Sequence, residues 1–447
     1  MKAAVFGGGI AGLLATLRLL NSRSISEVIL IENGPKLGGM LGSNKFGELQ
    51  VDMGTHLLSP NGCKEVNQTL GLYPNKLMRE IKAANGHAIN GAVYKTISLE
   101  TKGIFTDADK LIARQLIDIS VKPNIADCSH GAKFGDLLNN NLFIPAISRF
   151  ANVSKAEVSH LDDSIFVAAG LKRIRLSQKA LNEDLKKNSL YCDALLATHN
   201  EPQESTILYP KTGGMGSFIS NIEKKLLKSE KVKIKVGCGA KNFKIVGNKI
   251  SSFSTTDGEK DISVDLALWS APAQILGQIL GEKLNTKPRF NEMCILHIRG
   301  KGKILSDLCY FYQHDGLGWR YTLYNNFRTD LPPDEILIGV EIVGGPPLRD
   351  AIADESLIRL ISKELVDLNI VEPSFCVKDY NFRRILNGFP IIYRKNVKHM
   401  DRYTRALENR FANLSFVGRQ AGSAFFMRDV LNETFKKVNN LMSMMGL

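Results

Sequence analysis

The stretch VFGGGIAGLLATLRLL, residues 5–20, says more about the fold than any other part of the sequence. It starts within the short apolar run KAAVF (2–6), which is typical of a buried parallel strand. Residues 10–20 then repeat apolar side chains at helical spacing, and EVILIE (27–32) is a second buried run. Strand, glycine-rich turn, helix and strand in this order predict a β-α-β unit.

The glycines of the turn follow the spacing G-x-G-x-x-G, which gives each of them a separate physical role. Gly7 permits a tight turn, Gly9 lets the backbone approach a pyrophosphate, and Gly12 allows close packing of helix and strand. The pyrophosphate would meet free N–H groups at the helix start. Glu32, twenty residues after Gly12, can accept hydrogen bonds from a ribose. The sequence therefore predicts a dinucleotide-binding site.

The composition is that of a soluble globular protein of two or three domains: 447 residues, 44% hydrophobic and 23% charged. No uninterrupted apolar stretch reaches the length of about 18 residues that a membrane span needs. Arg18 interrupts the N-terminal apolar run, which argues against a secretory signal. The seven cysteines are scattered and form no C-x-x-C, so we expect no metal site and a reducing, cytoplasmic location.

The formal net charge of +13 admits three kinds of anionic partner: nucleic acid, an anionic membrane or a phosphorylated small molecule. It also fits a basic surface that is simply solvated. The basic residues form short groups such as KKLLKSEKVKIK rather than one long run, and no nucleic-acid-binding motif accompanies them. We therefore predict no nucleic-acid partner and a small-molecule substrate with an anionic group.

A second glycine cluster follows the second strand. Gly38 and Gly39 are adjacent, and the alternating segment ELQVDMGTH (48–56) comes next. With GGGIAG (7–12) and Glu32, these residues resemble the flavin-binding family of monoamine oxidases, phytoene desaturases, protoporphyrinogen oxidases and UDP-galactopyranose mutases. The resemblance implies FAD as the cofactor. Many of the amine oxidases have Arg after the paired glycines, where this chain has Met40.

The resemblance returns twice downstream. YPKTGGMGSFISNIEKKL (209–226) and the strands after it are similar to the family's second cofactor segment, and LSFVGRQAGSAFFMRDVLNETFKKVNNL (414–441) is similar to its last. In the family the final helix start faces the flavin, where its dipole can stabilise negative charge. The positions implied at the cofactor are Gly7, Gly9, Ile10, Ala11, Gly12, Glu32, Asn33, Gly38, Gly39, Met40, Gly54, Thr55, His56, Ala240, Ser270, Ala271, Gly418, Arg419, Arg428, Asp429 and Val430.

These matches predict an α/β fold with a Rossmann-type FAD-binding domain built from discontinuous segments: 1–70, 206–287 and 401–447. Residues 71–205 are expected to form a mainly helical insertion over the flavin, with Thr106 and Ser154 as helix caps. Residues 288–400 alternate like strands, which predicts an antiparallel-sheet substrate domain. The oligomeric state is not indicated.

Two residues are candidates for catalysis, His56 and Arg320. His56 suits a hydrogen bond to the flavin about as well as a structural role. The mutases have a segment similar to RYTLYNNF (320–327), which reaches the diphosphate of their substrate. The candidates for substrate binding are Arg320, Tyr324, Phe425 and Phe426, although aromatic residues are also common in ordinary sheet packing.

The sequence thus favours an FAD-dependent oxidoreductase that moves a hydride from a small organic substrate to the flavin. A mutase that acts on a nucleotide-linked sugar with reduced FAD is the alternative. The mutases place tyrosines after Gly-Arg to bind the diphosphate, where this chain has Ser423, Phe425 and Phe426, and each lost hydrogen bond to a charged group costs roughly 1.5–3 kcal/mol. A non-catalytic flavoprotein is the second alternative.

Overall fold

The computed structural model describes residues 1–60, 62–96, 98–105, 108–122, 129–200, 204–282, 289–343, 355–386, 388–421 and 426–446. The chain divides into two compact units. Unit 1 consists of residues 1–81, 207–287 and 396–447, and unit 2 of residues 82–206 and 288–395. Among the described residues, no helix combines the length and the apolar character that crossing a bilayer requires.

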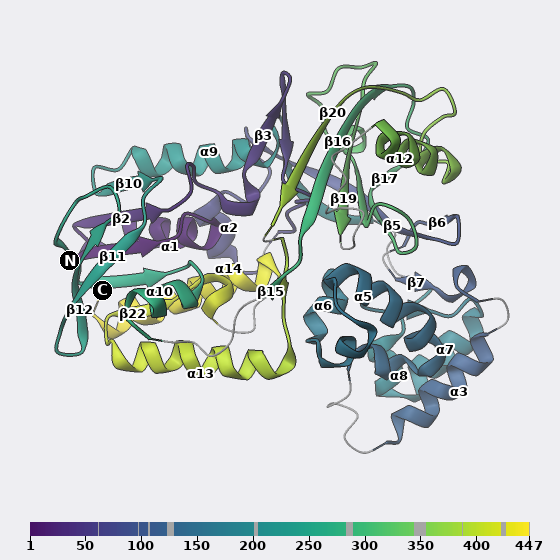
Figure 1. Cartoon of the computed structure of the whole chain (residues 1–447), viewed down its shortest axis with the longest axis horizontal. Coiled ribbons are helices and arrows are strands. Elements are labelled where there is room, and N and C mark those ends of the chain that lie inside the picture. The colour runs from purple at the N-terminus through teal and green to yellow at the C-terminus, as the bar shows by residue number, and fades with distance from the viewer. Residues whose placement is uncertain are drawn as a thin grey trace. The chain divides into compact units, whose positions relative to one another are not determined.

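Unit 1 is built on a parallel five-stranded sheet in the order β10-β2-β1-β14-β22 (Figure 1). Its strands are β1 (Lys2–Phe6), β2 (Glu27–Glu32), β10 (Val232–Val236), β14 (Leu266–Trp269) and β22 (Leu414–Phe416). The strands come from all three segments of the unit. The chain therefore leaves this sheet twice and returns to it twice.

Both faces of the parallel sheet are covered, as its continuous apolar strands require. Helices α1 (Ile10–Leu20) and α14 (Met427–Met444) pack together on one side, and α1 contacts the central strands. The other face packs in one apolar cluster against β12 (Lys249–Thr255), its partner strands β11 (Ala240–Val246) and β13 (Ile262–Ser263), and helices α10 (Ala273–Ile279) and α13 (Arg394–Arg410). Shorter elements of the unit are η1 (Gly39–Leu41), β3 (Ser43–Phe46), β4 (Leu49–Asp52), α2 (Lys64–Leu70), α9 (Gly214–Leu227) and η8 (Gly418–Ala421).

Unit 2 contains a sheet in the order β20-β16-β19-β18-β17-β5-β6, in which β9 also pairs with β5. Along the order of these seven strands the pairings are antiparallel, except that β17 runs parallel to β5. The strands are β5 (Met78–Ile89), β6 (Ala92–Tyr94), β9 (Glu204–Pro210), β16 (Met293–Lys301), β17 (Leu308–Gln313), β18 (Arg320–Leu323), β19 (Ile336–Val343) and β20 (Cys376–Ile385).

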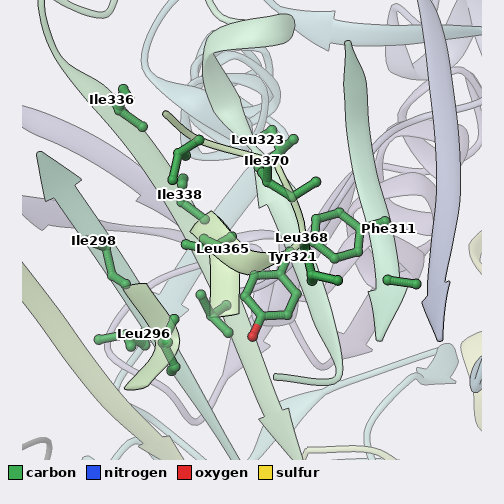
Figure 2. Packing of buried hydrophobic residues seen from close by; sticks show 14 of the residues in the cluster. Leu296, Ile298, Phe311, Tyr321, Leu323, Ile336, Ile338, Leu365, Leu368 and Ile370 are labelled. Carbon is green, nitrogen blue, oxygen red and sulfur yellow. The ribbon is translucent and has the colours of Figure 1, made fainter. Parts of the chain in front are cut away.

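One face of this sheet forms the apolar core of unit 2 together with helix α12 (Glu355–Asp367). Figure 2 shows part of this cluster and labels Leu296, Ile298, Phe311, Tyr321, Leu323, Ile336, Ile338, Leu365, Leu368 and Ile370. Because side chains alternate along a strand, the residues between them face the other way. That second face contains a polar group, which we call the polar face of the sheet: Tyr312, Arg320 and Glu341 are cross-strand neighbours on it.

The helical part of unit 2 lies between β6 and β9 in the chain. It contains α3 (Asp109–Ser120), α4 (Asp136–Leu138), η5 (Asn139–Phe143), α5 (Ile144–Ala151), η6 (Lys155–His160), α6 (Asp163–Ala168), α7 (Lys179–Asn188) and α8 (Leu190–Leu195). Short pieces are β7 (Leu99–Glu100), η2 (Thr101–Gly103), η4 (Gly131–Phe134), β8 (Ile174–Arg175), β15 (Arg289–Phe290), η7 (Tyr324–Asn326) and β21 (Pro390–Ile391).

The predicted α/β fold class is confirmed, and the β-α-β unit occupies the predicted positions. The segment after residue 70 differs in one respect, because it does not begin with helices. Its first long element, β5, pairs with β17 in the large sheet, and the helices follow. Ser154 caps its helical turn through a capping box with Glu157. The other expected cap, Thr106, lies outside the described residues.

Candidate dinucleotide site

Two glycines of the turn after β1 are required by the protein's own packing. Gly7 has a φ of +109°, and a Cβ there would lie 2.6 Å from the Ser270 hydroxyl oxygen. At Gly12 a Cβ would lie 1.9 Å from the carbonyl oxygen of Gly7. Neither position can accept a side chain without moving the backbone. The conformation of the turn therefore requires glycine at both positions.

Gly9 is different, because nothing among the described residues requires it to be a glycine. Its φ of −71° and ψ of 177° are open to any residue, and a Cβ placed there would meet no described atom within 4 Å. It is the N-cap of α1, and no side chain caps that end of the helix. The first turn therefore has no side-chain cap among the described residues, and an anion-binding helix start needs its N–H groups left for the ligand in this way.

Glu32 ends β2 beside the turn, and backbone N–H groups hold its side chain on both sides. Gly8 donates to one carboxylate oxygen over 2.6 Å, and Gly34 donates to the other over 2.6 Å. Each carboxylate oxygen has a second lone pair left for a ligand. The second segment of unit 1 returns here as well, since Gly237 donates to the Gly34 carbonyl (2.7 Å) and Cys238 to that of Glu32 (3.0 Å). Ala240 follows at the start of β11.

The paired glycines lie against the same turn. Gly38 donates its N–H to the Gly8 carbonyl over 2.8 Å, and both Gly38 and Gly39 have positive φ. A Cβ at Gly39 would lie 3.5 Å from the Cα of Gly9. The second glycine cluster thus borders the open space at Gly9, and Met40 beside it is 36% exposed.

The third segment completes this end of the sheet. Ser270 donates its hydroxyl to the Gly7 carbonyl over 3.1 Å. Gly418 has a φ of +76°, and a Cβ added there would lie 3.1 Å from the Cβ of Ala11. Val430 of α14 is buried against Ala11. The carboxyl ends of β1, β14 and β22 therefore meet at one place, where ligands of open parallel sheets bind.

Other predicted cofactor residues lie in unit 1 with less defined surroundings. The ring of half-buried His56 contacts the Met53 carbonyl oxygen at 3.1 Å, after Gly54 with its φ of +103°. Arg419, Arg428 and Asp429 are exposed. Phe426 precedes α14 and is 39% exposed. Ser423 and Phe425 lie outside the described residues, and all these assignments stay predictions.

Sequence reasoning missed one buried network next to this site. Asp52 is 1% exposed and accepts hydrogen bonds from the Ser43 hydroxyl (2.8 Å), the Tyr209 hydroxyl (2.5 Å) and the Met215 N–H (2.8 Å). A Cβ on Gly214 would lie 2.6 Å from a carboxylate oxygen of Asp52, which explains the second glycine of the pair in YPKTGGMGS. The carboxylate fixes the start of α9, as the helix dipole favours. The acid in VDMG and the tyrosine in YP were visible, but their pairing was not.

The substrate candidate Arg320 belongs to unit 2 and forms a bidentate ion pair. Its Nε and Nη2 donate to the two carboxylate oxygens of Glu341 over 2.9 and 2.8 Å, and its guanidinium lies 5.7 Å from the centre of the Tyr312 ring. Burial alone lowers the pKa of Arg320, but Glu341 and the neighbouring tyrosines raise it to a net value above the usual one. Its charge is therefore largely balanced within the unit.

Tyr324, the other substrate candidate in unit 2, is 1% exposed. Its ring lies 5.5 Å from that of Phe327 and 5.7 Å from the guanidinium carbon of Arg328. These contacts resemble ordinary packing on the polar face of the sheet. The roles of Arg320 and Tyr324 toward a substrate stay predictions.

A pair of buried histidines lies on the same unit. The rings of His87 and His314 are 6.2 Å apart, and both residues are buried. Burial lowers the pKa of His87 to about 4 and that of His314 to about 3. Both are therefore neutral at physiological pH.

Solved structures of similar fold cover nearly the whole chain. A reduced UDP-galactopyranose mutase superposes with a TM-score of 0.73 at 15% identity, over 99% of this chain and 94% of that one. A protein from Exiguobacterium sp. 255-15 described as a protoporphyrinogen oxidase gives 0.70 at 14% identity, over 99% of both chains. Cyclohexylamine oxidase from Brevibacterium oxydans IH-35A gives 0.62 at 11% identity, over 100% and 99%.

The sequence itself matches the family model of an NAD(P)-binding Rossmann-like domain over residues 5–70. No curated protein matches the chain by sequence. At 11–15% identity the structural likeness concerns the fold. The predicted likeness to these proteins is confirmed in the fold, while the reaction and the substrate are matters of proposal.

Proposed function

We propose that this protein is an FAD-dependent oxidoreductase whose cofactor lies at the carboxyl ends of the parallel strands of unit 1. The observation that carries the proposal is the open space at Gly9. A glycine that neither backbone conformation nor packing requires, at an uncapped helix start, is explained by a ligand that approaches the backbone.

The residues around this space fit the two ends of a dinucleotide. The N–H groups at the start of α1 would hold the pyrophosphate, and Glu32, whose carboxylate is already oriented by Gly8 and Gly34, would accept from a ribose hydroxyl. Gly39 and Gly418 would allow close approach of the rest of the cofactor. When bound, FAD would supply the capacity to accept a hydride from a small organic substrate.

Two side chains of the protein, His56 and Arg320, are proposed to bind and orient the cofactor and the substrate. His56 donates from Nε2 to the Met53 carbonyl, so its other ring nitrogen would accept a hydrogen bond from the cofactor. Arg320 would orient an anionic substrate group with the guanidinium N–H groups that Glu341 does not use, because the pair fixes the guanidinium plane. The free thiols of the described cysteines agree with the proposed reducing, cytoplasmic location.

A mutase is the second candidate, favoured by the structural likeness to UDP-galactopyranose mutase over 99% of this chain. The two reactions differ in electron balance. An oxidoreductase takes two electrons from each substrate molecule, whereas a mutase acts with reduced FAD and no net redox change.

Anaerobic mixing tests the proposal. The purified protein is expected to be yellow and to release FAD with acid, as absorbance and mass measurements would show. Candidate amines, porphyrinogens and sugar nucleotides are then added while the flavin band is followed. Bleaching by a substrate and recovery with an acceptor support the oxidoreductase. Isomerisation of a sugar nucleotide only after dithionite reduction overturns it in favour of the mutase, and a protein that cannot take up FAD overturns both.

A further inference from the structure

Helix α13 has one face buried in unit 1 and one face open to solvent. Thr404 and Leu407 are buried, and Met400 and Tyr403 pack against the apolar cluster behind the parallel sheet. Figure 1 shows α13 as an outer helix of this unit. Its exposed residues fall on one side of the helix, which we call the α13 basic face: Lys395, Lys398, His399, Arg402, Arg405, Ala406, Asn409 and Arg410.

The α13 basic face carries five cations and no exposed carboxylate. The two acids of the helix are half-buried and already engaged: Asp401 pairs with Arg405 (3.1 Å), and Glu408 accepts from the Phe416 N–H (2.8 Å). Arg410 pairs with Glu282. Within the part of the chain that the structure describes, the other three, Lys395, Lys398 and Arg402, have no ion pair or hydrogen bond.

This arrangement is unfavourable for the isolated helix. Lys395, Lys398 and Arg402 follow one another at spacings of three and four residues, where like charges repel. The first turn contains no acidic residue, so Lys395 also opposes the helix dipole. A negatively charged partner would relieve both effects.

The basic composition of the chain does not by itself explain the face. Elsewhere in unit 1 three strand lysines have acidic partners: Lys233 pairs with Glu27 (2.8 Å), Lys235 with Asp257 and Glu259 (3.0 and 2.6 Å), and Lys244 with Asp261 (2.7 Å). Lys395, Lys398 and Arg402 of α13 lack the acidic partners that these three lysines have among the described residues.

We propose that the α13 basic face docks the protein on an anionic lipid bilayer. The face is one helix wide and has only Ala406 as an exposed apolar residue, so it lacks the apolar centre of a stable protein interface. It also lacks an exposed aromatic residue for stacking on nucleic-acid bases. A bilayer surface needs no shape complementarity, because separate Lys and Arg residues near it contribute independently. The proposal does not depend on the cofactor or the reaction.

Vesicle sedimentation tests it with the full-length protein. Vesicles of phosphatidylcholine with phosphatidylserine should bind the protein at low ionic strength, and added salt should release it. The variant Lys395→Gln/Lys398→Gln/Arg402→Gln should lose about a hundredfold in partition coefficient. It should also melt at a higher temperature than the wild type, since the substitutions remove repulsion, so poor folding cannot explain the loss.

The matched control is Lys224→Gln/Lys225→Gln/Lys228→Gln, which removes the same charge from the exposed end of α9. It should bind the vesicles like the wild type. Equal losses in the two variants would show that net charge alone drives binding and would overturn the proposal. Absence of binding to anionic vesicles, equal binding to pure phosphatidylcholine, or tighter binding to duplex DNA or to an acidic protein would overturn it as well.

Discussion

The two units position polar groups in different ways. At the candidate dinucleotide site of unit 1, most contacts come from the backbone: Gly8 and Gly34 hold Glu32, and α1 presents its uncapped start. On the polar face of unit 2, side chains hold side chains, as in the pair of Arg320 with Glu341. A site formed by backbone N–H groups depends on glycines at fixed spacing in the sequence. A site formed by paired side chains depends on residues that different strands bring together.

This difference predicts different responses to substitution. A side chain added at a glycine of unit 1 either collides with the protein or enters the space of a ligand. In unit 2, removal of one member of a buried pair leaves an uncompensated group behind. The predictions that follow test this contrast in order of decreasing effect.

The largest effect is expected at Gly9. Gly9→Val should weaken FAD binding by more than about a thousandfold, because several hydrogen bonds to charged pyrophosphate oxygens would be lost. The melting temperature of the FAD-free protein should change little, since a Cβ at Gly9 would meet no described atom within 4 Å. Gly12→Ala is the matched comparison: its Cβ would collide with Gly7, so this variant should lose stability with or without FAD. FAD titration and thermal melts measure both effects, and normal FAD affinity in Gly9→Val would contradict the site.

The next effect concerns the buried ion pair of unit 2. Glu341→Gln leaves the Arg320 guanidinium without its anion and should lower the free energy of unfolding by roughly 3–5 kcal/mol. Replacing both residues, as Arg320→Met with Glu341→Leu, should restore most of it. Asp367→Asn breaks the exposed pair with Lys363 (2.5 Å) and should cost less than about 1 kcal/mol. Urea unfolding measures all three, and equal losses at the buried and exposed pairs would contradict the contrast.

A third effect is the pH dependence of stability. The pKa of His87 is lowered by burial to about 4 in the folded protein, so below pH 6.5 the unfolded chain binds protons that the folded one does not. The free energy of unfolding should therefore fall as pH falls from 6.5 to 4, by about 3 kcal/mol for His87 alone. His87→Phe should flatten this part of the profile, and the exposed His399→Gln should not. If His87→Phe left the pH dependence of the free energy of unfolding unchanged, other titrating groups would have to account for it.

The smallest effect is expected at Glu32. Glu32→Ala should weaken FAD binding by roughly 1–3 kcal/mol, since it removes one charged acceptor while the pyrophosphate contacts remain. Glu27→Ala, at the other end of β2, is the control and should leave FAD affinity unchanged. If Glu32→Ala weakened FAD binding as much as Gly9→Val, the contact with the ribose would contribute as much to affinity as the contacts with the pyrophosphate.

The local elements of unit 1 could be predicted because their signals are local. The G-x-G-x-x-G spacing, the continuous apolar strands and the terminal Glu32 each reflect a constraint within about thirty residues. Paired glycines at 38–39 and 213–214 were also visible, although only the structure shows that Gly214 is kept small by Asp52. The strands of unit 2 were visible from alternation, but the pairing of β5 with β17, more than two hundred residues apart, was not.

The sequence by itself determined the α/β class, the β-α-β unit and the glycine turn, because hydrophobic period and glycine conformation act over a few residues. Only the tertiary structure decided which glycine serves the fold and which leaves room for a ligand. It also decided that Arg320 is balanced by Glu341, and that three cations of α13 lack such a partner among the described residues while Lys233 of β10 has one. Those facts depend on atoms brought together by long-range packing, and no local pattern encodes the distance between them.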